Sequence, residues 1–260
     1  MIINMNNKVV FFGGPDYGKS TVIGYLYAQT YNINMDHIEK EVREELGGNY
    51  KPDYLFSSLV NPHQAESVRR GEKANSKQHE IKNIKVESFG FPVNITLIDT
   101  PGHDIYLSGR ELGMSMSDIG IFCLAIEKVL ANDFEGIIFK YSDLYSEYHP
   151  NGKLIYLLTM FDMENVNYEE RNYHIACKKI KQQCRYVEVK HTENVFGSDI
   201  SFFSDEIDVA AIIPVAVEFK TKEKDGINFF SRSKKTSWYE GPTLIGAMQN
   251  QIIDLSLNHV

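Results

Sequence analysis

The chain has no apolar run long enough to cross a bilayer. A membrane-spanning helix needs about 20 consecutive apolar residues. Although 43% of the 260 residues are hydrophobic, none of their runs approaches that length. The first residues lead straight into a predicted strand, without the basic and apolar leader of a secreted protein. We therefore expect a cytoplasmic protein that does not insert into membranes.

Cysteine is scarce, which argues against a disulfide framework or a zinc knuckle. The three cysteines are Cys123, Cys177 and Cys184, an odd number at spacings unlike those of metal sites. We expect reduced thiols. Cys177 and Cys184 lie seven residues apart in a predicted helix, so they share one face and are expected to pack there.

An excess of positive charge is also missing. The chain has 27 Lys and Arg against 35 Asp and Glu, a formal net charge of −8. This balance argues against a protein that wraps nucleic acid by releasing counterions. It leaves open a local basic patch, since the placement of charge matters more than its sum. The lysines at 178, 179 and 181 form such a run, which reads as a solvated helix face or as a docking patch.

The most informative segment is a glycine-rich loop near the N-terminus. Residues 13–20 read GGPDYGKS and match the phosphate-loop pattern G-x-x-x-x-G-K-[ST]. An apolar strand is predicted over 8–12 before the loop, and a helix over 21–31 after it. In this context backbone N–H groups and a helix N-terminus can hold a phosphate chain, Lys19 can reach the β- and γ-phosphates, and Ser20 can bind Mg²⁺. The alternative is a glycine-rich turn that binds nothing.

The rest of the chain alternates predicted strands with helices and shows no internal repeat. This order predicts an α/β fold, a P-loop NTPase fold with a mostly parallel sheet of about six strands and helices on both faces. A polar, irregular stretch at about 188–208 is predicted to be an insertion loop. Strands are predicted over 8–12, 84–89, 93–98, 119–126, 154–158 and 209–217, and helices over 21–31, 36–46, 133–147, 168–184 and 243–255.

A second chemical motif, DTPGH at residues 99–103, directly follows a predicted strand. Asp99 can hold Mg²⁺ through a water opposite Ser20. Gly102 has no side chain, so its N–H can face a γ-phosphate, and His103 can orient the attacking water. The motif is stronger evidence here than alone, because it stands ~80 residues after a phosphate loop.

At these two motifs the chain resembles the translational GTPases of the elongation factor 1-alpha/Tu group, and it is also similar to the GTPase subunit of bacterial ATP sulfurylase. Those proteins show G-H-V-D-x-G-K-[ST] and D-[CAT]-P-G-H. The residues at 237–244, SWYEGPTL, resemble the family's P-W-[YF]-x-G-P-T-L. Segments at 39–41 and 66–71 resemble the helical switch-I insert of the eukaryotic, archaeal and sulfurylase types.

The resemblance implies one GTP-binding domain over 1–260, with a helical switch-I insert at about 32–71, that binds GTP or GDP with Mg²⁺. It implies catalytic roles for His103 and Lys19 and metal contacts from Ser20 and Asp99. The nucleotide contacts it implies come from Gly13, Asp16, Tyr17, Gly18, Lys19, Ser20, Thr21, Gly102, Thr159, Met160, Asp162, Ala216 and Val217.

The chain also departs from the family. The guanine-reading N-K-x-D is replaced by TMFD at 159–162, and AVE at 216–218 lacks the serine of S-[AG]-x. The switch-I R-G-I-T is replaced by RGEK at 70–73, so the Mg²⁺-binding threonine is missing unless Ser76 takes its place. The two β-barrel domains typical of members have no counterpart here, so we do not expect delivery of aminoacyl-tRNA.

Two functions follow from this sequence. The first is a GTP-binding protein that slowly hydrolyses GTP and switches conformation. The second is a non-hydrolysing nucleotide-binding or docking module that regulates a partner protein. The resemblance leaves that protein partner open between a ribosome and an enzyme subunit.

Overall fold

The computed structural model describes residues 6–47, 51–52, 54–61, 80–88, 91–134, 136–150, 152–196, 209–219 and 226–258. Its centre is a six-stranded sheet in the order β2-β3-β1-β4-β5-β6, in which only β2 and β3 pair antiparallel. The predicted α/β architecture is therefore confirmed. The strands are β1 (Asn6–Phe12), β2 (Glu80–Ser88), β3 (Phe91–Asp99), β4 (Ile119–Ala125), β5 (Leu154–Thr159) and β6 (Val209–Pro214).

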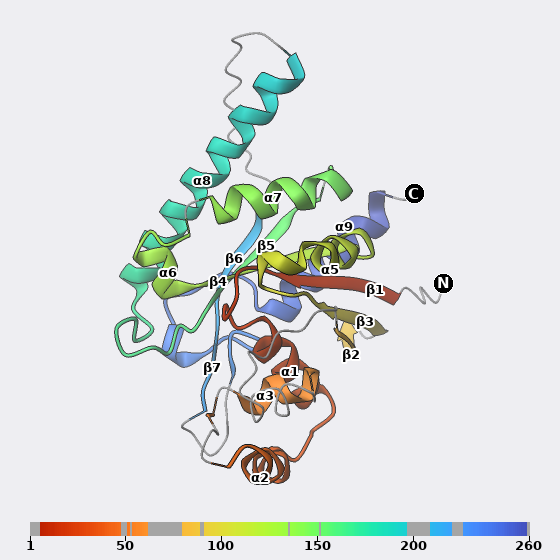
Figure 1. The fold of residues 1–260 in the computed structure, drawn as a ribbon, viewed down its shortest axis with the longest axis vertical. Coiled ribbons are helices and arrows are strands. Elements are labelled where there is room, and N and C mark those ends of the chain that lie inside the picture. Colours follow the sequence, from red (N-terminus) through yellow and green to blue (C-terminus); the bar gives the residue numbers. More distant parts are fainter. Residues whose placement is uncertain are drawn as a thin grey trace.

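Helices cover both faces of this sheet (Figure 1). On one side α1 packs against β2 and β3, α3 packs on α1, and α2 packs on α3; on the other side lie α5, α7 and α8. The helices are α1 (Lys19–Thr30), α2 (Met35–Leu46), α3 (Tyr54–Val60), α5 (Leu107–Ser115), α6 (Ile126–Leu130), α7 (Ile137–Tyr148), α8 (Glu170–Phe196) and α9 (Leu244–Asn258), with short 3₁₀ turns η2 (Asp104–Tyr106) and η3 (Lys234–Thr236).

The middle strands explain why the sheet is parallel. Every residue of β4 (IGIFCLA) and of β5 (LIYLLT) is buried. A strand that is apolar along its whole length needs cover on both faces, and the crossover helices of a parallel sheet supply it. Because the chain returns to the same end of each strand, the loops after β1, β3, β4 and β5 meet at one edge.

One predicted loop is wrong in its first part. Residues 188–196 belong to α8, which continues to Phe196 instead of ending near Cys184. The segment 185–196 contains no glycine or proline, so its polar residues do not interrupt the helix. In Figure 1 α8 extends well beyond the sheet at the top of the view. The remainder of the predicted loop, 197–208, lies outside the described residues.

The last predicted strand is two strands. β6 ends at Pro214, which has no N–H to continue the ladder. The chain then pairs Ala216–Val217 (β7) antiparallel with Gly226–Ile227 (β8) in a small separate sheet. Other boundaries differ less: the helix predicted from 133 starts at Ile137.

Two helices, α2 and α3, lie within residues 32–71, where the helical insert is predicted, and Asn34 caps α2 by accepting from the N–H groups of Asp36 and His37. The residues at 62–79, including the switch-I departure at 70–73 and Ser76, lie outside the described part. Among the helices that the structure describes, none has the length and apolarity to cross a bilayer. All three cysteines are free thiols.

Candidate functional site

The glycine-rich loop connects β1 to α1 and passes directly beside β4. Gly13 has φ 145°, and a Cβ atom placed there would lie 2.3 Å from the carbonyl oxygen of Cys123. No other residue fits this position, because both the backbone conformation and the space exclude a side chain. The loop is thus pressed onto the carboxyl end of β4, at the edge where the other loops meet.

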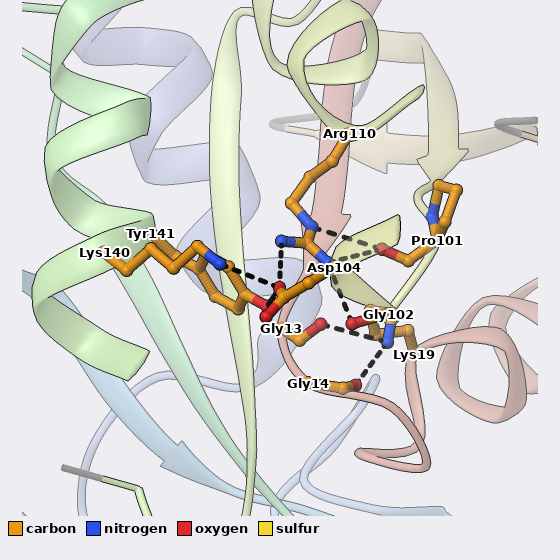
Figure 2. Close-up of polar contacts among 9 residues, drawn as sticks. All are labelled: Gly13, Gly14, Lys19, Pro101, Gly102, Asp104, Arg110, Lys140 and Tyr141. Atoms are coloured by element: carbon orange, nitrogen blue, oxygen red, sulfur yellow. Dashed lines mark hydrogen bonds and ion pairs between the residues drawn. The ribbon is translucent and has the colours of Figure 1, made fainter. Parts of the chain in front are cut away.

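Lys19 stands at the start of α1 with its side chain inside this loop. Its ammonium donates to the carbonyl oxygens of Gly13 at 3.3 Å and Gly14 at 2.7 Å (Figure 2). The side chain is buried, and this burial lowers the pKa of Lys19; the nearby Asp99 carboxylate opposes the shift. A bound anion would favour the charged amine, so the position suits a phosphate ligand.

Ser20 and Asp99 bring oxygen atoms together beside Lys19. The Ser20 hydroxyl donates to Oδ2 of Asp99 at 2.5 Å, across 79 positions of sequence. Mg²⁺ prefers hard oxygen ligands and keeps several waters. A hydroxyl and a carboxylate fit that preference. Among the described residues there is no cluster of three or more His, Cys, Asp or Glu that could hold a metal alone. A Mg²⁺ ion bound here would need further oxygen ligands besides these two side chains.

The loop after β3 lies against the glycine-rich loop. Thr100 ties it to β1, donating from its N–H at 3.2 Å and its hydroxyl at 2.8 Å to the carbonyl of Phe11. Gly102 follows, and a Cβ atom there would lie 2.7 Å from Cα of Pro15. Only glycine allows the two loops to approach this closely. His103 follows and lines the same cavity.

A single cavity of about 560 Å³ collects almost all of the predicted site. This volume lies in the range of roughly 300–1,000 Å³ that is usual for small-molecule sites. Gly13 is the exception: it packs against Cys123 of β4, and its carbonyl accepts from Lys19. The predicted residues that line the cavity are Asp16, Tyr17, Gly18, Lys19, Ser20, Thr21, Asp99, Gly102, His103, Thr159, Met160, Asp162, Ala216 and Val217.

Thr159 lines the cavity and also connects two loops through its hydroxyl. Its hydroxyl donates to the carbonyl of Tyr17 at 2.9 Å, with the carbonyl of Leu124 at 3.3 Å. Thr159 is buried, so its proton is used to tie the ends of β4 and β5 to the glycine-rich loop. The hydroxyl cannot donate to a base at the same time.

Thr159→Val tests this tie. The change keeps the shape but leaves buried carbonyls without their donor, so we expect the free energy of unfolding to fall by about 1–3 kcal/mol. Thermal and urea unfolding would measure it. As a matched control, Thr30→Val on α1 removes a hydroxyl that donates within its own helix. An equal loss in both variants would contradict a special role for the tie between loops.

The segment after Thr159 is bent and held from several sides. Met160, Asn167 and Tyr168 all have positive φ, at 61°, 44° and 57°. Such angles persist only where surrounding contacts impose them. Here the N–H of Tyr168 donates to the carbonyl of Phe161 at 3.1 Å, and Trp238 Nε1 donates to the carbonyl of Tyr168 at 3.0 Å. This segment places exposed Asp162 and half-buried Met160 at the cavity rim.

Two groups of polar residues were not predicted. One holds Glu218, which directly follows β7 and accepts from the Tyr168 hydroxyl and from Lys235. The other joins Arg110, Asp104, Lys140 and Tyr141 behind the loop after β3. No sequence motif marks either group. The helix that carries Arg110, α5, was not among the predicted helices.

The basic run on α8 has a structural explanation for one member. Lys179 donates to the carbonyls of Val129 at 3.1 Å and Leu130 at 2.6 Å, at the C-terminal end of α6. Lysine suits this position, since the carbonyls at a helix C-terminus interact favourably with a positive charge.

Comparison with known proteins places these features in a family. Residues 4–226 match the family described as "Elongation factor Tu GTP binding domain". Elongation factor 1-alpha of Archaeoglobus fulgidus is 26% identical over 241 residues, covering 92% of this chain and 48% of the relative. The GTP-binding subunit of the eukaryotic peptide chain release factor of Candida maltosa is 26% identical, covering 94% of this chain and 30% of that protein. The chain thus spans about half the length, or less, of the curated relatives it matches.

Solved structures share the fold. The GTPase-like domain of Ski7 from S. cerevisiae, solved with GDP and inorganic phosphate, superposes with a TM-score of 0.62 at 21% identity, over 99% of this chain and 51% of that one. Sup35 complexed with GDP gives a TM-score of 0.56 at 16% identity, over 95% of this chain and 44% of that one. At these identities the likeness concerns the fold.

Proposed function

The chain belongs to the family of elongation factor Tu GTP-binding domains, and we propose that it binds guanine nucleotide with Mg²⁺, hydrolyses GTP slowly and changes conformation with the bound nucleotide. The observation that carries the proposal is spatial. Lys19, Ser20, Asp99, Gly102 and His103, which come from two loops far apart in sequence, line one cavity at the edge where the parallel strands end. This is where nucleotides bind in open α/β sheets.

In the proposed complex each of these residues has one task. The Lys19 ammonium lies against the β- and γ-phosphates, and the N–H groups at the start of α1 surround the phosphate chain. Ser20 and Asp99 would hold Mg²⁺, which when bound would supply positive charge against the phosphate oxygens. His103 orients the water that attacks the γ-phosphate.

At the end of the cavity that holds the base in the proposed complex, fewer side chains contact guanine than the family motif N-K-x-D would supply. Asp162 accepts from the N1 and N2 hydrogens of guanine, and its charge repels the N1 acceptor of adenine. Met160 covers the ring with an apolar side chain. Ala216 and Val217 are buried and line the cavity, and in the proposed complex they lie beside the base. Because the Thr159 hydroxyl is used elsewhere, we expect guanine preference at reduced affinity, with each lost contact costing ~0.5–1.5 kcal/mol.

His103→Ala tests the hydrolytic part. If His103 orients water, the single-turnover rate of GTP hydrolysis should fall at least roughly tenfold, equal to ~1.4 kcal/mol of barrier. The affinity for GDP should stay within about twofold, because the water lies beyond the phosphates that GDP retains. His174→Ala is the matched control, since His174 is an exposed histidine of α8 paired with Glu170. An unchanged rate in His103→Ala would remove His103 from the mechanism.

A second candidate is a nucleotide-binding module that does not hydrolyse and instead regulates a partner protein. The replacement of the switch-I threonine by Lys73 favours it, because this threonine would be a ligand of Mg²⁺. A wild-type protein that binds GTP with Mg²⁺ but shows no single-turnover hydrolysis would support the second candidate over the first.

A further inference from the structure

Arg110 is a cation that the interior of the molecule completely encloses. It lies on α5, its exposed fraction is 0%, and its guanidinium faces the loop after β3. A buried charge is costly unless its hydrogen-bonding groups are satisfied. The contacts that satisfy this one are unusual, because most of them are backbone carbonyls of the loop that carries Gly102 and His103.

The guanidinium grips two consecutive carbonyls. Nε and Nη2 donate to the oxygen of Pro101 at 3.2 and 3.1 Å, and Nη2 also donates to the oxygen of Gly102 at 2.8 Å (Figure 2). Figure 2 shows Gly102 between the guanidinium and the end of Lys19. The planar fork of arginine can engage adjacent oxygens in this way, whereas a lysine ammonium has no fixed fork.

The guanidinium is itself anchored from α7. Its central carbon lies 4.1 Å from the centre of the Tyr141 ring, and Nη1 lies 3.5 Å from Oδ1 of Asp104. The same Oδ1 accepts from the Tyr141 hydroxyl at 3.0 Å and pairs with Lys140 at 3.0 Å. The hydrogen bond from Lys140 lowers the pKa of Asp104, so this group is a carboxylate at neutral pH.

The hydrogen bonds from Arg110 to these carbonyls fix the direction of two backbone N–H groups. The described chain contains no cis peptide bond. In a trans peptide the carbonyl of one residue and the N–H of the next point in opposite directions. With the oxygens of Pro101 and Gly102 turned toward Arg110, the N–H groups of Gly102 and His103 point away from it. Neither N–H donates to another residue that the structure describes.

We propose that Arg110 is a positioning residue that holds the N–H groups of Gly102 and His103 ready for the terminal phosphate of the nucleotide. Gly102 and His103 line the cavity and Gly102 lies against Pro15, so these N–H groups are on the side of the loop opposite the guanidinium. The cation also polarises both peptide groups, which strengthens their N–H donors. This inference rests on the proposed function, because it assumes a nucleoside triphosphate in the cavity.

The test compares two affinities. A non-hydrolysable GTP analogue and GDP are titrated, with Mg²⁺, into the wild type, Arg110→Met and Arg110→Lys. We expect Arg110→Met to bind the analogue about tenfold more weakly, equal to ~1.4 kcal/mol. GDP, which lacks the γ-phosphate, should bind within about twofold of the wild type. Arg110→Lys restores charge without the fork, so its affinity for the analogue should stay within about threefold of that of Arg110→Met.

Controls separate this role from general damage to α5. Met114→Leu changes another fully buried side chain of the same helix at similar volume, and it should leave both affinities unchanged. Thermal unfolding shows whether each variant is folded. Should Arg110→Met not fold, Asp104→Asn weakens the anchor more gently, and about a threefold loss for the analogue alone is then expected.

The outcomes are distinguishable. A wild type that binds neither nucleotide would overturn the proposed function and this role together. A wild type that binds both, with Arg110→Met weakening both equally or neither, would overturn only the role of Arg110, because its contribution would then be structural. Full recovery in Arg110→Lys would overturn the orienting role, since charge alone would suffice.

Discussion

Lys19→Ala is expected to weaken the binding of both GDP and GTP by roughly a hundredfold or more. The ammonium is enclosed by the glycine-rich loop and lies at hydrogen-bonding distance from the carbonyls of Gly13 and Gly14. In the proposed complex it supplies charge-assisted hydrogen bonds to phosphate, and each is worth ~1.5–3 kcal/mol. Titration with a fluorescent guanine nucleotide would measure the loss.

The matched control is Lys178→Ala, because Lys178 is an exposed lysine on α8. It removes one positive charge from the molecule without touching the cavity and should leave the affinity unchanged. Unfolding of the nucleotide-free protein would show that Lys19→Ala is folded. A folded variant with the affinity of the wild type would refute the claim that this loop holds phosphate.

Asp162→Asn is expected to reverse the choice of base, from guanine to xanthine. Asparagine offers an amide donor where aspartate has only acceptors, and xanthine has a carbonyl in place of the 2-amino group of guanine. The variant loses charge-assisted hydrogen bonds to guanine worth ~1.5–3 kcal/mol each. The ratio of the two affinities should therefore shift by roughly a hundredfold or more.

Competition between GTP and XTP for the fluorescent nucleotide would measure this ratio. Glu164→Gln is a suitable control, since Glu164 is an exposed carboxylate in the same segment but does not line the cavity. An unchanged ratio in Asp162→Asn, or equal binding of ATP and GTP by the wild type, would mean that Asp162 does not read the base.

The parts of the site that could be predicted from sequence depend on the backbone. The segment at 13–20 must contain glycine at Gly13 because a side chain would collide with β4, and Gly102 must lack one because it lies against Pro15. Positions where only glycine fits occur at fixed spacing within one segment, so they can be recognised as a pattern in the sequence. The alternation of apolar strands with helices predicted the sheet for a similar reason, since burial on both faces requires unbroken apolar runs.

The remaining features depend on contacts between distant segments, which leave no local pattern. Arg110 grips carbonyl oxygens, and every residue has a carbonyl, so no neighbouring residue type marks the contact. Thr159 lines the cavity, but its hydrogen bonds to Tyr17 and Leu124 depend on how three loops meet. The polar end of α8 is a different case: it has no apolar periodicity that would predict a helix, although no glycine or proline interrupts it.

The length of α8 has a mechanical consequence. Its 27 residues correspond to a rod of ~40 Å, and the rod begins at Glu170, two positions after the bent segment that ends at Tyr168. A rotation of the rod about its base by one degree displaces its far end by ~0.7 Å. A rotation of about three degrees at the end of the helix next to the cavity would thus displace the tip by ~2 Å. Energy transfer between fluorophores at the two ends of α8 and a fluorophore on the sheet would measure the angle between this helix and the sheet.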